Sequence, residues 1–150
     1  MKKLGIFTIL AFVFLVGCGD SKTSTASLTA SDYIDKLKEA GHPIGLVVDY
    51  TAETDPNELL GRPNQYTSKS NFADTTIEQL DPTDPDGGSV EVFKTKKDAE
   101  NRKKYIDNIG ESMPMLTEYS YINGTALLRL SKSLTPDQAE KYKGTFMEIK

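Results

Sequence analysis

Histidine and cysteine are the side chains best suited to nucleophilic catalysis and to zinc binding, and this chain has one of each. His42 lies in the stretch Ala40-Gly41-His42-Pro43, between a helix-ending glycine and an apolar segment, and no recognisable serine motif accompanies it. A zinc site needs about four nitrogen or sulfur ligands, or three and a water. The sequence therefore predicts neither a histidine-based catalytic triad nor a zinc site, and His42 is interpreted as a loop residue.

Residues 81–88, Asp-Pro-Thr-Asp-Pro-Asp-Gly-Gly, have the composition of an acidic calcium loop. If Gly87 takes the sixth position of an EF-hand loop, however, Pro82 takes the first ligand position and Phe93 the twelfth, where carboxylates are needed. Asp-Pro and Asp-Gly steps are also ordinary in turns. The stretch is therefore interpreted as a loop, and we predict no metal and no cofactor.

A group of basic residues lies in the second half of an otherwise acidic chain. Its members are Lys94, Lys96, Lys97, Arg102, Lys103 and Lys104. They form either the solvated outer face of an edge helix or a contact surface for a polyanion such as teichoic acid or lipid headgroups. The whole chain has a formal charge of −4, which disfavours nucleic acid as a partner.

The segment 54–69, TDPNELLGRPNQYTSK, is richer in polar and special-geometry residues than a connector requires. The predicted binding residues within it are Arg62, Asn64, Gln65, Tyr66 and Lys69. The alternative is that these side chains cap helices and satisfy loop backbone. If the chain is a binding domain, we expect a shallow patch without paired carboxylates. An enzyme that uses Asp and Glu residues predicts paired carboxylates in a cleft, with one of them desolvated.

The first 17 residues have the pattern of a secretory signal, with Lys2 and Lys3 followed by an apolar run. The run ends before the ~20 residues that a membrane-spanning helix needs. It leads into Leu15-Val16-Gly17-Cys18, which resembles the bacterial lipobox. The resemblance implies a bacterial lipoprotein that is cut before Cys18, carries a diacylglyceryl group on the Cys18 sulfur, and is held by it at the extracytoplasmic face of the membrane.

Three segments follow from this interpretation: a signal peptide over 1–17, a lipidated N-terminus with a flexible tether over 18–30, and a single α+β domain over 31–150. In the domain we expect an antiparallel sheet of three or four strands with two or three helices packed against it. The predicted elements are a helix over 31–40, strands over 44–51 and 89–93, a capped turn over 55–61, a helix over 96–109, a hairpin over 118–131 and a helix that begins after Thr135. The long connection before residue 89 leaves open one more strand, around 72–80.

The dipeptide Asn123-Gly124 favours a two-residue type I′ turn, which pairs Tyr121 with Ala126 and Glu118 with Arg129. One face of this hairpin is then apolar and is predicted to be its core face, with Tyr119, Tyr121, Ala126, Leu128 and Leu130. An apolar sheet face needs a cover. The C-terminal helix offers one in the stripe of Ala139, Tyr142, Phe146 and Ile149.

Together with GGSVEVF and EYSYINGTALLRLSKSLTPDQAEKY, the 54–69 segment resembles a small domain of unassigned function found in many bacterial surface lipoproteins and other exported proteins. The resemblance covers roughly residues 31–149. It implies a compact α+β unit and export, and it supplies no catalytic residues. We therefore expect a non-catalytic, lipid-anchored surface protein that binds an unidentified protein or cell-envelope component, with a small envelope hydrolase or transferase as the alternative.

Overall fold

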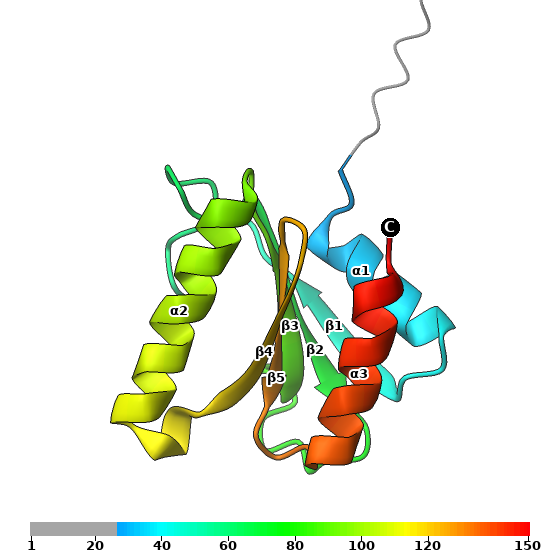
Figure 1. Cartoon of the computed structure of the whole chain (residues 1–150). Helices are drawn as coiled ribbons and strands as arrows, with labels where there is room; N and C mark the ends of the chain where they lie inside the picture. The colour runs from blue at the N-terminus through cyan, green and yellow to red at the C-terminus, as the bar shows by residue number, and fades with distance from the viewer. Residues whose placement is uncertain (1–26) are drawn as a thin grey trace, which may run out of the picture.

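The computed structural model describes residues 27–150, so Cys18 and the predicted signal peptide lie outside the described residues. The described chain forms one sheet and three α-helices (Figure 1). In order, the elements are α1 (Ala30–Glu39), β1 (Ile44–Asp49), β2 (Ser68–Asp74), β3 (Gly87–Val92), α2 (Lys96–Ser112), the 3₁₀ helix η1 (Pro114–Leu116), β4 (Glu118–Asn123), β5 (Ala126–Ser131) and α3 (Pro136–Glu148).

All neighbouring strands are antiparallel, in the order β1-β2-β3-β5-β4. The predicted α+β class is confirmed, but the expected three or four strands are wrong, because the sheet has five. The physical reason is β2, which begins at Ser68 rather than at the predicted residue 72. Its polar first half pairs with β1 on one side and with β3 on the other, and so joins β1 to the sheet.

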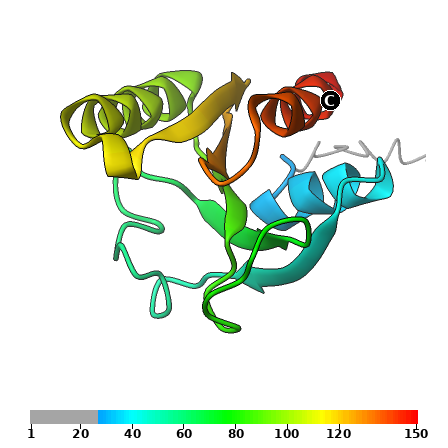
Figure 2. The same cartoon turned by 90° about the horizontal axis from the view of Figure 1, so that it is seen from below.

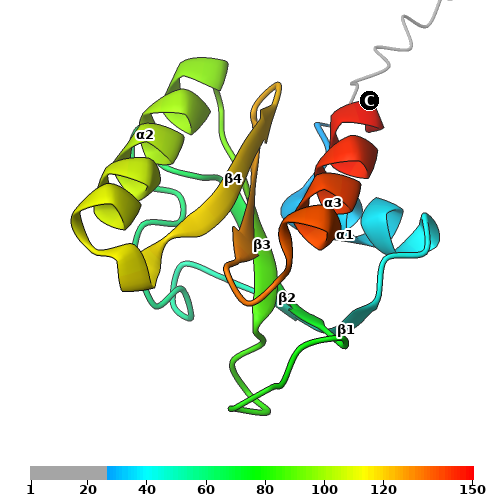
Figure 3. The same cartoon turned by 60° about the horizontal axis from the view of Figure 1, so that its bottom comes forward.

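The helices cover both faces of the sheet. Helices α1 and α3 lie side by side on one face, and α2 lies on the other (Figures 1 and 3). On its own face α2 packs against β4 and β5, which leaves the β1–β2 half of that face to loops (Figure 2). No helix within residues 27–150 is long and apolar enough to cross a membrane.

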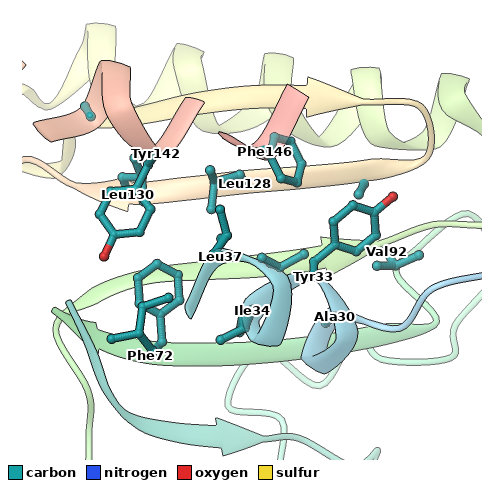
Figure 4. Close-up of a cluster of buried hydrophobic side chains, with 14 of the residues drawn as sticks. Ala30, Tyr33, Ile34, Leu37, Phe72, Val92, Leu128, Leu130, Tyr142 and Phe146 are labelled. Atoms are coloured by element: carbon teal, nitrogen blue, oxygen red, sulfur yellow. The ribbon is translucent and has the colours of Figure 1, made fainter. Parts of the chain in front are cut away.

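The larger core lies between the sheet and the pair α1 and α3 (Figure 4). The predicted apolar face of the hairpin is confirmed: Ala126, Leu128 and Leu130 are buried in this core, and its two tyrosines pack against it. The side chain of Phe146 is fully buried and its ring lies 5.5 Å from that of Tyr33 in α1. The predicted docking of the C-terminal helix on the sheet is therefore confirmed.

Capping boxes begin both helices of this layer. In α1 the Thr29 hydroxyl accepts from the Asp32 N–H at 3.2 Å, and the Asp32 carboxylate accepts from the Thr29 N–H at 2.7 Å. Thr135 and Gln138 form the same pair of bonds at the start of α3, as predicted. Helix α1 begins at Ala30, and Leu28 already packs against the core.

The register of the β4–β5 hairpin differs from the prediction. Tyr121 pairs with Leu128 rather than with Ala126, and Asn123 pairs with Ala126. The two-residue loop is therefore Gly124-Thr125, and only Gly124 has a positive φ, of 59°. A glycine at the first loop position with positive φ suits a type II′ turn rather than type I′.

Tertiary contacts select this register, because the Asn123 Nδ2 donates to the carbonyls of Phe146 and Ile149 at the end of α3, at 2.8 Å each. A shift of two residues keeps every side chain on the face where the pattern placed it. The core prediction therefore holds in spite of the wrong register, and Arg129 contacts Glu118 diagonally instead of directly.

A second, smaller core lies under α2 and joins Tyr66, Phe93, Ala99 and Leu127. Helix α2 extends to Ser112, three residues beyond its predicted end. As predicted, few of its apolar side chains are buried, and the rest of this sheet face is polar. That polar face positions the charged residues described next.

Candidate functional site

The long connection between β1 and β2 is folded around the carboxylate of Asp55. Its Oδ2 accepts hydrogen bonds from the Tyr66 hydroxyl at 2.6 Å and from the N–H groups of Leu59 and Leu60 at 2.9 and 3.1 Å. Its Oδ1 accepts from the Lys69 Nζ at 2.8 Å in an almost completely buried ion pair. One acidic side chain therefore ties the loop to its own backbone and to β2.

These contacts explain how a buried carboxylate stays ionised. Burial by itself raises the pKa of Asp55, but hydrogen bonds from Lys69 and Tyr66 outweigh it and hold that pKa well below its ordinary value. The pKa of the Tyr66 phenol is raised by burial and further by its bond to Asp55. Asp55 therefore acts as a fixed anion and Tyr66 as a fixed hydrogen-bond donor at neutral pH.

The loop itself is a series of turns rather than the capped helical turn predicted over 55–61. Glu58 has a φ of 52°, which ends any helical geometry there. Gly61 has a φ of 81°, and its N–H donates to the Tyr66 carbonyl at 2.8 Å. Asp55 nevertheless accepts hydrogen bonds from the N–H groups that follow it. The predicted cap is therefore present, but the predicted helical turn is not.

Of the five predicted binding residues, two are buried. Tyr66 is 0 % exposed and Lys69 is 4 % exposed, so neither offers a free surface to a partner. The other three are Arg62, Asn64 and Gln65, at the tip of the loop; the first two are exposed and Gln65 is half-buried. The Arg62 side chain forms an exposed pair with Glu58, at 3.5 Å.

Asn64 and Gln65 line a shallow hollow of about 350 Å³ between the loop and α2. Arg102 and the half-exposed Tyr105 form its helix side, and the guanidinium carbon of Arg102 lies 5.5 Å from the centre of the Tyr105 ring. This hollow combines amide, guanidinium and aromatic groups on a surface, which is the composition of a protein-binding patch.

A second buried ion network crosses the polar sheet face. Glu91 is fully buried and accepts from Arg102 at 2.9 and 3.2 Å and from Arg129 at 2.9 Å. Arg129 also forms a two-bond pair with Glu118, with both distances 2.7 Å. The sequence indicated Arg102 as a member of the basic group and gave no sign of a role for Glu91, whose partners come from two other elements.

The other members of the predicted basic cluster are turned to solvent or paired within α2. Lys96 lies 3.6 Å from Glu100 and Lys103 lies 2.8 Å from Asp107, each one helical turn away. Such exposed pairs contribute little to stability. The interpretation as a solvated outer helix face therefore fits every member except Arg102 and Lys103, because the half-buried Lys103 also donates to the Ser120 hydroxyl of β4 at 2.7 Å.

A cleft of about 640 Å³ opens at the other side of the sheet, between α3 and the loop after α1. Asp74 is fully buried at its base and accepts from the Tyr142 hydroxyl at 2.7 Å, and also from the Thr76 N–H and hydroxyl. His42 stacks on the Tyr142 ring at 4.1 Å between centres and shares a 2.8 Å hydrogen bond with the Thr145 hydroxyl.

Nothing in the sequence distinguishes Asp74, because a single aspartate at the end of a strand is also common in ordinary turns. The pKa of His42 is lowered by burial, although the charge of Asp74 opposes that shift. His42 is therefore predominantly neutral at neutral pH. Within residues 27–150 no three His, Cys, Asp or Glu side chains are placed to hold a metal ion.

The fold and these sites define the class of the domain: an antiparallel sheet covered by helices on both faces, with buried ion networks on its polar face. No protein-family model matches the chain, and comparison with curated proteins and with solved structures gives no match either.

Proposed function

We propose that this protein is a non-catalytic lipoprotein, anchored through Cys18 at the extracytoplasmic face of a bacterial membrane, whose domain binds a protein or another component of the cell envelope. The support for the anchor is the lipobox-like stretch Leu15-Val16-Gly17-Cys18 after an apolar run. A diacylglyceryl group has two acyl chains, which is what durable anchoring requires.

The observation that carries the binding function is the rigid presentation of the loop tip. Asp55 fixes the loop through five hydrogen bonds, from Tyr66, Lys69 and the backbone N–H groups of Asn57, Leu59 and Leu60. A loop held in this way loses little conformational entropy when a partner binds. The backbone that carries Arg62, Asn64 and Gln65 is therefore held in place, with Asn64 and Gln65 in the hollow that Tyr105 also lines.

A photo-cross-linking residue at position 65, introduced into the full chain in living cells, tests this proposal. The matched control carries the same residue at exposed Lys38 in α1, on the opposite side of the sheet. We expect a discrete adduct from position 65 and none from position 38, and we expect Arg62→Ala with Asn64→Ala to weaken it. Equal adducts from both positions would refute a binding surface at the loop tip.

The cleft beside α3 supports the second candidate function, a small envelope hydrolase or transferase. Buried Asp74 and exposed Glu148 both line it, together with His42. Two carboxylates in different environments are the usual equipment for acid and base roles. Incubation of the protein with purified envelope polymers tests this: an enzyme would release soluble fragments, and Glu148→Gln, at an exposed position, would abolish the release without unfolding the protein.

A further inference from the structure

A groove of about 500 Å³ crosses the polar face of the sheet where α2 does not cover it. Its floor belongs to β2, β3 and β5. Its walls come from residues 56–57, from the loop before β3, and from η1 with the start of β4. The last two walls lie at the end of the molecule that comes forward in Figure 3. The cleft and the hollow described above do not share this floor.

The floor is a continuous row of polar side chains. Asn71 pairs across the strands with Ser89, and Ser89 pairs with Arg129. Directly opposed residues on one face have Cβ atoms about 4.5–5.5 Å apart. Lys69 lies two positions from Asn71 on the same strand and hence on the same face. A ligand in the groove therefore meets an amide, a hydroxyl and the Arg129 guanidinium at close spacing, while Lys69 is 4 % exposed and offers little surface.

Both cations in the floor are already neutralised. Lys69 is paired with Asp55 at 2.8 Å, and Arg129 is paired with Glu91 and Glu118 at 2.9 and 2.7 Å. Arg129 uses three of the five N–H groups of a guanidinium in these bonds. The remaining N–H groups can donate to a ligand, although the charge of Arg129 is already balanced by Glu91 and Glu118. The floor is therefore suited to uncharged polar groups rather than to anions.

Two groups in the floor still lack hydrogen bonds among the described residues. Asn71 Oδ1 is buried without a partner, while its Nδ2 donates to the Tyr50 hydroxyl at 3.2 Å. Within residues 27–150, no side-chain hydrogen bond involves the Ser89 hydroxyl. A buried acceptor left unsatisfied is costly, about 1–3 kcal/mol. Because only one end of the Asn71 amide is held, rotation of its last side-chain torsion can bring Oδ1 to a ligand.

The walls add apolar surface to this polar floor. Pro56 and Pro85 come from the two loops, and Met115 and Leu116 come from η1. Met115 is 74 % exposed, and Leu116 is exposed as well. The walls also carry the charged residues Asp84, Asp86 and Lys132. A ligand that fits must therefore present hydroxyl or amide groups to the floor and C–H surfaces to the apolar parts of the walls.

From these features we propose that the groove binds an uncharged carbohydrate segment. Sugar hydroxyls both donate and accept, so they satisfy the Asn71 amide, the Ser89 hydroxyl and the spare N–H groups of Arg129. The C–H faces of a pyranose ring are apolar and match the proline and methionine walls. A peptide in extended form is recognised chiefly by pairing with a strand edge, and this groove lies on a sheet face.

This groove is separate from the loop-tip surface of the proposed function, so either proposal can be refuted while the other stands. The test uses the full chain in detergent micelles, with chitotetraose, maltotetraose and mannotetraose as uncharged probes and a heparin tetrasaccharide as the charged one. Calorimetry should show binding of at least one uncharged probe. Its affinity should be the same in about 0.05 and 0.5 M salt, because only charged contacts are screened.

Asn71→Leu and Ser89→Ala should each weaken binding of that probe by about tenfold, the effect of one lost hydrogen bond. Lys38→Ala, at an exposed position of α1 on the opposite face of the sheet, is the matched control and should bind as the wild type does. Melting curves should show both floor variants folded, because Asn71→Leu removes an unsatisfied buried acceptor together with the bond to the Tyr50 hydroxyl, and Ser89→Ala removes none of the observed side-chain hydrogen bonds. Binding of none of the uncharged probes, stronger binding of the heparin tetrasaccharide, or unchanged affinity in both floor variants would overturn the proposal.

Discussion

The substitution Asp55→Ala tests how the candidate binding loop is held. It leaves the ammonium group of Lys69, which is 4 % exposed, without a counter-ion, and it removes the acceptor of Tyr66 and of three backbone N–H groups. Removal of one partner from a buried ion pair costs about 3–5 kcal/mol. That is a large fraction of the about 5–15 kcal/mol by which a domain is usually stable.

Urea denaturation of the full chain at pH 7, followed by circular dichroism, measures this loss of unfolding free energy. Glu58→Ala is the control in the same loop: it breaks the exposed pair with Arg62, at 3.5 Å, and should cost at most about 1 kcal/mol. The double variant Asp55→Leu with Lys69→Met removes both charges and should recover most of the stability lost in Asp55→Ala.

The same pair has a pH signature. The pKa of folded Asp55 lies below its ordinary value of 3.8, so the unfolded chain takes up the proton first as the pH falls. The stabilisation is therefore complete above that ordinary value and is lost as the pH falls below it toward the depressed folded pKa. The difference in unfolding free energy between wild type and Asp55→Asn should be constant from about pH 5 to 7 and shrink below about pH 4.

A loss of less than about 1 kcal/mol in Asp55→Ala, or a difference that does not change with pH, would refute this account. The loop would then be held by its turns alone. In that case Asp55 would not be what holds Arg62, Asn64 and Gln65 in place, and the loop tip could not be treated as a preorganised binding surface.

Three further predictions concern the core, the hairpin and the anchor. Phe146→Ala removes a fully buried ring and should cost about 3–5 kcal/mol in urea denaturation, whereas Lys104→Ala on the exposed side of α2 should stay within about 0.5 kcal/mol. Gly124→Ala places a Cβ at a φ of 59° and should cost about 1–2 kcal/mol, although no neighbouring atom obstructs it; a neutral result would contradict the positive φ. Cys18→Ala should abolish the incorporation of labelled fatty acid, and a variant that is still labelled would rule out the lipid anchor.

Local patterns in the sequence predicted much of the fold. The helix caps at Thr135 and Gln138 depend on residues three positions apart, and alternation along β4 and β5 depends on neighbours. Both kinds of signal are short in range, and the structure confirms them. The hairpin turn was predicted wrongly, since the choice between two glycine turns was made by Asn123 bonding to the end of α3.

Only part of the candidate site could be foreseen. The composition of residues 54–69 indicated a loop with more than a connecting role, but it could not separate buried Tyr66 and Lys69 from exposed Arg62 and Asn64. That separation depends on Asp55, whose capping position was visible in the sequence while its ion pair with Lys69 was not. In a sequence, polar loop residues that face solvent cannot be distinguished from those that bond to another part of the same chain.

The sequence by itself determined the three helices, the hairpin strands and the likeness to a lipobox at Cys18, because each of these depends on residues close together in the chain. Tertiary structure alone decided the five-stranded sheet, the network around Glu91 and the groove over Asn71 and Ser89. Glu91 obtains its partners from α2 and β5, respectively 11 and 38 residues away. A buried charge is stable only when such partners converge, and their convergence is set by how the strands pair and the helices pack rather than by the residues beside it.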